Sequence, residues 1–61
     1  MDIFTASMMV EDQLEEYTEE QALEAWQWLV DTGHAWTLQG WYGRTAQHLI
    51  NMGAIRAPVT N

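Results

Sequence analysis

The sequence predicts an all-α fold, a small helical hairpin of residues 19–31 and 41–52 with a short N-terminal helix or arm in front of it. Apolar side chains recur every three or four residues in both segments, which is the period of an amphipathic helix. A glycine stands just beyond each segment, where helices commonly end. The whole chain, residues 1–61, is expected to form a single domain.

The N-terminal part of that domain, residues 1–17, is predicted to be an acidic arm or a short helix. Val10, Leu14 and Tyr17 are spaced by four and three residues, which favours an amphipathic helix over 8–17. The preceding residues mix apolar and small side chains, and we expect an extended arm or the lead-in to a helix there.

The first helix of the hairpin is predicted to begin after Thr18. Thr18 and Gln21 have the spacing of a capping box, and two glutamates follow in the first turn. A break at Thr18 is expected because one straight helix through it would carry two opposed apolar faces. An unbroken helix remains an alternative if a second subunit covers one of those faces.

The rest of the hairpin (18–55) continues through a connector over 34–40, which has room for one helical turn, to the second helix. Gly43 interrupts that helix, which suggests close approach of another backbone, here the first helix. Pro58 argues against further helix in the tail, 56–61. The predicted core consists of Leu23, Trp26, Leu29, Val30, Leu38, Tyr42, Ala46, Leu49 and Ile50, with Ile55 and Val59 as anchors of the tail.

A chain of 61 residues buries only about 60% of its unfolded surface and has little stability to spare. It has no cysteine, so no disulfide or thiolate site contributes. The two histidines, His34 and His48, are far apart in the sequence, and we expect no metal or other cofactor. Close helix packing and formation of a homodimer are the expected sources of stability.

The charge is strongly acidic and unevenly placed. The net charge is −7, all nine acids lie in the first 31 residues, and both cations, Arg44 and Arg56, come after them. This balance disfavours direct binding of nucleic acid or anionic membranes and favours a basic protein surface as partner. No segment has the length or composition of a membrane span or signal peptide, so a cytoplasmic location in the host cell is expected.

Two series of acids repeat every four residues, one through Glu11, Glu15 and Glu19 and one from Asp12 to Glu24. On a continuous helix they would form carboxylate rows with a charge density close to that of a DNA strand. DNA mimicry is therefore an alternative to a solvated helix face, and a break at Thr18 would weaken it. No nucleophile and base are paired in the sequence, so we expect no enzymatic activity.

Three tryptophans and one arginine are candidates for contact with a partner. Trp28 points away from Trp26 on the helix and is expected to be exposed or at an interface, where tryptophan is enriched. Trp36 and Trp41 flank the connector, and one of them is expected in the core. Arg44 is expected to pair with an acid such as Asp31, to stack on Trp41 or Tyr42, or to contact a ligand.

The stretch "AWQWLVDTGHAWTLQGWYGRTAQHLINMGAI", residues 25–55, resembles a family of short acidic proteins of tailed phages. The shared features are an Asp-Thr-Gly turn (31–33), a W-x-L-Q-G segment (36–40) and a G-R-T-A helix (43–46). The resemblance covers about half of the chain and implies a phage origin, in a family of unknown function.

The leading hypothesis is a non-catalytic phage accessory protein that binds and modulates a host or phage protein. The alternatives are a DNA-mimic inhibitor of a nucleic-acid-binding enzyme and a self-assembling structural or virion component. The predicted partner-binding residues are Glu15, Glu16, Glu19, Glu20, Trp28, Trp36, Trp41 and Arg44.

Overall fold

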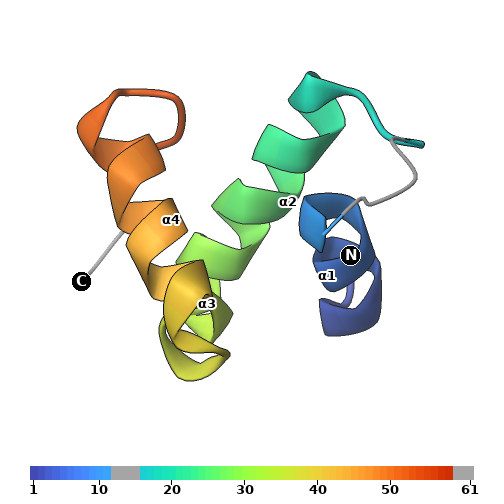
Figure 1. The fold of residues 1–61 in the computed structure, drawn as a ribbon, viewed down its shortest axis with the longest axis horizontal. Coiled ribbons are helices and arrows are strands. Elements are labelled where there is room, and N and C mark those ends of the chain that lie inside the picture. The colour runs from blue at the N-terminus through green and yellow to red at the C-terminus, as the bar shows by residue number, and fades with distance from the viewer. Residues whose placement is uncertain (12–15, 59–61) are drawn as a thin grey trace.

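The computed structural model describes residues 1–11 and 16–58, and all the regular structure in these ranges is helical. Four helices follow one another: α1 (Ile3–Glu11), α2 (Glu19–Asp31), α3 (His34–Thr37) and α4 (Gly40–Asn51). Helix α1 packs beside α2, while α3 turns the chain so that α4 rises on the other side of α2 (Figure 1).

Helix α1 begins earlier than the apolar spacing predicts. Asp2 caps it, because its Oδ1 accepts the backbone N–H of Thr5 at 2.8 Å, and this bond lowers the pKa of Asp2. The predicted helix over 8–17 is therefore wrong in its bounds. Tyr17 lies beyond α1, and Leu14 lies outside the described residues.

Helix α2 has the predicted start. Thr18 adopts an extended conformation (φ −77°, ψ 162°), its Oγ1 accepts the N–H of Gln21 at 3.1 Å, and Gln21 Oε1 accepts the N–H of Thr18 at 2.8 Å. The capping box is confirmed, and the helix does not run through Thr18.

Glycines end both long helices in the left-handed conformation that side chains disfavour, Gly33 at φ 83° and Gly53 at φ 79°. After α4, the N–H groups of Gly53 and Ala54 donate to the carbonyls of Ile50 and Leu49 at 3.1 and 2.9 Å. These two hydrogen bonds form a Schellman motif, which satisfies the last carbonyls of the helix.

The core lies along α2 and receives side chains from every helix. Five predicted core residues are buried, and Leu23, Leu38, Leu49 and Ile50 are partly buried against them. The prediction missed the small residues Ala6, Ala25 and Ala35 and the side chain of Met9, and it placed Ile55 correctly as an anchor. The buried set is Ala6, Met9, Ala25, Trp26, Leu29, Val30, Ala35, Tyr42, Ala46 and Ile55.

Helix α3 (His34–Thr37) forms the turn between α2 and α4, which we call the α3 corner. Helices α2 and α4 diverge from it, so the hairpin is more open than a pair of closely packed antiparallel helices (Figure 1). Large aromatic side chains bridge them. The tail is held to α2 by Gln27, whose Oε1 accepts the N–H of Arg56 at 2.7 Å and whose Nε2 donates to the Arg56 carbonyl at 3.0 Å.

Candidate protein-binding surfaces

Three aromatic rings fill the space between α2 and α4. Trp41 and Tyr42 stack with centroids 4.1 Å apart, and Trp26 meets them at 6.2 and 5.7 Å. Trp41 also donates its Nε1 hydrogen to Gln39 Oε1 at 3.1 Å. Trp41 is thus the predicted connector tryptophan that joins the packing, and part of its ring stays accessible.

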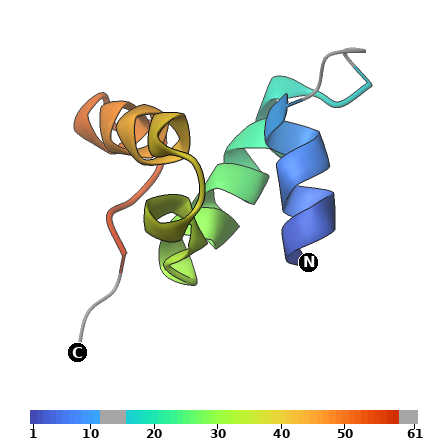
Figure 2. The ribbon, with the colours of Figure 1, turned by 60° about the horizontal axis from the view of Figure 1, so that its bottom comes forward.

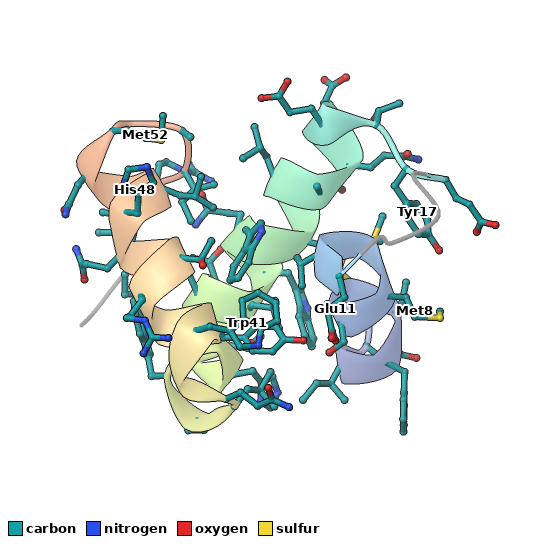
Figure 3. The ribbon with its side chains drawn as sticks, in the orientation of Figure 1. Met8, Glu11, Tyr17, Trp41, His48 and Met52 are labelled. Carbon is teal, nitrogen blue, oxygen red and sulfur yellow. The ribbon has the colours of Figure 1, made fainter. Side chains whose placement is uncertain are left out.

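Tyr42 also reaches α1. Its hydroxyl donates to Glu11 Oε2 at 2.7 Å, and Figure 3 shows Glu11 on the side of α1 that faces α4. Burial of the ring, followed by this bond to a carboxylate, raises the pKa of Tyr42. The contact joins residues 31 positions apart and ties the first helix to the last.

The other two candidate tryptophans lie near the α3 corner. Trp28 is half-buried, and its ring packs on His34 with a centroid distance of 5.4 Å. Trp36 is 44% exposed and leans on the α4 backbone at Gly43. A Cβ built at Gly43 would lie 3.5 Å from Trp36 Cε3. The neighbour of this glycine is therefore α3, whereas the sequence had suggested the helix over residues 19–31, which is α2.

Arg44 does not form the internal clamp that the sequence suggested. Within residues 1–11 and 16–58 it forms no ion pair and no ring contact, while Asp31 accepts a hydrogen bond from Gln27 at 3.0 Å. The guanidinium lies over Gly40, where its Nη1 would be 3.4 Å from a built Cβ. Arg44 is therefore an exposed cation on α4.

Several acidic side chains lie at the N-terminal end of α2, away from α3. We call Glu16, Glu19, Glu20 and Glu24 the acidic start of α2; all four are exposed. In the part of the chain that the structure describes, no arginine or histidine pairs with Glu19, Glu20 or Glu24. Glu15, the remaining candidate, lies outside the described residues.

The candidate residues therefore form two separate surfaces. Helix α2 has 13 residues, a length of about 20 Å, and the acidic start lies at one end while α3 with Trp36 follows the other end. The sequence predicted both groups as partner-binding residues without placing them relative to one another.

A third exposed surface, on α1, was not predicted from the sequence. The outward face of α1 exposes Phe4 (80%) and Met8 (57%), and Figure 3 shows Met8 directed away from the other helices. The signal in the sequence was Asp2, which as an N-cap would have placed these residues on a helix.

A family model described as a domain of unknown function, DUF7417, matches residues 3–60. The chain belongs to this family. Comparisons with curated proteins and with solved structures give no match.

The match spans all four helices of the DUF7417 domain. None of the described helices is long and apolar enough to cross a membrane. The described residues also bring no group of three or more histidine, aspartate or glutamate side chains together for a metal ion.

Proposed function

We propose that this DUF7417 domain is a non-catalytic protein-binding module whose acidic start of α2 attracts a basic surface on another protein. The observation that supports this is the exposure of Glu19, Glu20 and Glu24 without a neighbouring cation in the described chain. Unpaired carboxylates on one helix end speed the encounter with a cationic partner and give the association a strong salt dependence.

The resemblance of residues 25–55 to small tailed-phage proteins supports a host or phage protein in the host cytoplasm as the target. Trp36 offers a candidate contact for the same partner at the other end of α2. Tryptophan and arginine are both enriched in binding hot spots, and Trp36 and Arg44 are both exposed.

A protein partner fits the geometry better than competition with DNA. Mimicry needs a straight row of carboxylates through Thr18, and the extended cap at ψ 162° redirects the chain at that residue. The carboxylates of α1 and α2 therefore do not continue one another along a single helix axis.

The test begins with capture of a partner from host lysate on the tagged protein, followed by purification of that partner. We expect a Glu19→Gln/Glu20→Gln/Glu24→Gln variant to lower the association rate constant and to flatten its dependence on salt. The matched control is Asp31→Asn, which removes a carboxylate from the far end of α2. Equal rate constants for the wild type and the triple variant would contradict the proposal.

The contribution of Trp36 is tested separately on the same partner. A Trp36→Ala variant is expected to speed dissociation, whereas Trp36→Phe keeps an aromatic ring and should retain most of the lifetime of the complex. If Trp36→Ala leaves the dissociation rate unchanged, the α3 corner is not part of the contact.

A further inference from the structure

Helix α1 carries large apolar side chains on two opposite faces. The inner face buries Ala6 and Met9 against the core, while Phe4 and Met8 are 80% and 57% exposed on the outer face. Phe4 and Met8 are one helical turn apart and therefore share one face, about opposite to Ala6. A helix that is apolar all round is normally buried all round.

The outer face is also free of charge over two turns. Between Asp2 and Glu11, α1 contains only uncharged residues, and Thr5 and Ser7 are the polar ones. In a chain with net charge −7, this is an unusual surface to leave in water.

We propose that a second copy of this chain covers the outer face, with the two α1 helices packed antiparallel. A two-fold axis at the level of Ala6, midway between Phe4 and Met8, places Phe4 of each copy against Met8 of the other. The same contact then forms twice, as a two-fold interface requires. It is a methionine sulfur against an aromatic ring, a favourable pair.

The charge distribution selects the antiparallel arrangement. Figure 2 shows that the C-terminal end of α1 lies toward the acidic start of α2. Antiparallel packing puts the two acidic starts at opposite ends of the helix pair, about 14 Å apart along α1, which exceeds the screening length of about 8 Å at physiological salt. Parallel packing would set them side by side.

The size of the face sets the strength of the dimer. A stable interface buries about 800 Å² on each partner, or about a fifth of the 4374 Å² surface of this chain. A face of two exposed turns provides less than that. We therefore expect a rapid monomer–dimer equilibrium. Its dissociation constant should fall as the salt concentration rises, because salt screens the repulsion between two chains of charge −7.

Sedimentation equilibrium across the micromolar to millimolar range, at low and at high sodium chloride, tests the interface. Phe4→Gln or Met8→Gln should raise the dimer dissociation constant by about tenfold or more, because each removes an apolar contact from both copies. The matched control is Met52→Gln, which changes a methionine with 64% exposure at the end of α4 and should leave the constant unchanged.

A chain that stays monomeric under all of these conditions, or a dimer that is insensitive to Met8→Gln, would overturn the proposal. Weakening of the dimer by salt would overturn it as well, since it would indicate ionic contacts.

The antiparallel register has its own test, because the chain contains no cysteine. When Phe4→Cys and Met8→Cys chains are mixed and oxidised, the disulfide between the two different variants should predominate. A parallel pair would instead favour disulfides between identical variants, and that result would overturn the register.

Discussion

The hydroxyl of Tyr42 donates a hydrogen bond to the carboxylate of Glu11 at 2.7 Å, and this bond connects α4 to α1. Helix α1 otherwise rests on α2 through small and flexible side chains such as Ala6 and Met9. The Tyr42–Glu11 bond is therefore a specific polar contact between α1 and α4, and Ser7 of α1 forms a side-chain hydrogen bond with the same tyrosine.

Removal of this bond should destabilise the fold modestly. Tyr42→Phe keeps the buried ring and loses only the hydroxyl, so we expect the free energy of unfolding to fall by about 1 kcal/mol, the usual net value of one hydrogen bond. Urea denaturation of Tyr42→Phe, Glu11→Ala and the double variant measures it. If the two single changes are additive, the bond contributes nothing to stability.

The stability should also fall as the pH rises above about 10. Because burial and Glu11 raise the pKa of Tyr42, the folded state holds the phenol proton more tightly than the unfolded chain does. Its contribution is complete below the usual tyrosine pKa of about 10 and is lost as the pH rises through the raised value.

Melting temperatures across this range, together with the phenolate absorbance, check the titration. The chain has neither lysine nor cysteine, so tyrosines dominate the titration in this window. Tyr42→Phe should flatten the pH dependence, and Tyr17→Phe isolates the absorbance of Tyr42. An equally steep loss of stability in Tyr42→Phe would refute the assignment.

Gly43→Ala should stabilise the protein. The added methyl would lie 3.5 Å from Trp36 Cε3 and 3.6 Å from the Ala35 carbonyl oxygen, both ordinary contacts, and alanine is favoured over glycine inside a helix by about 1 kcal/mol. Thermal and urea unfolding measure the gain.

The control is Gly33→Ala, where φ is 83° and a side chain costs about 1–2 kcal/mol. A destabilised Gly43→Ala would mean that Trp36 is packed more tightly on α4 than these distances indicate.

The capping box makes a similar prediction at the start of α2. Thr18→Ala removes the acceptor for the Gln21 N–H and should cost about 1 kcal/mol, while Thr18→Ser keeps the acceptor and should cost little. Equal unfolding midpoints for the alanine and serine variants would show that the cap does not hold the helix.

The sequence was sufficient for α2 and α4 because their signals are local. The Thr18–Gln21 capping box, the apolar stripe through Trp26 and Val30, and the terminal glycines each act within a few residues. The start of α1 was missed because its apolar residues surround the helix and leave no stripe, so that the single side chain of Asp2 carried the signal.

The contacts at the candidate surfaces depend on tertiary structure and were beyond the sequence. Nothing local links Tyr42 to Glu11, and nothing local decides that Trp36 is exposed while Trp41 stacks on its neighbour. Arg44 was assigned to Asp31 on charge alone. Ion pairs between exposed side chains gain so little free energy that opposite charge is a poor guide to pairing.

The uneven placement of the tryptophans gives the molecule two independent optical signals. All four tryptophans lie on α2, α3 and α4, whereas α1 contains none. Indole fluorescence therefore follows the part of the fold after Thr18, and far-ultraviolet circular dichroism follows every helix. If the first helix separates before the rest unfolds, the dichroism transition will precede the fluorescence transition, and their coincidence would demonstrate a single cooperative unit.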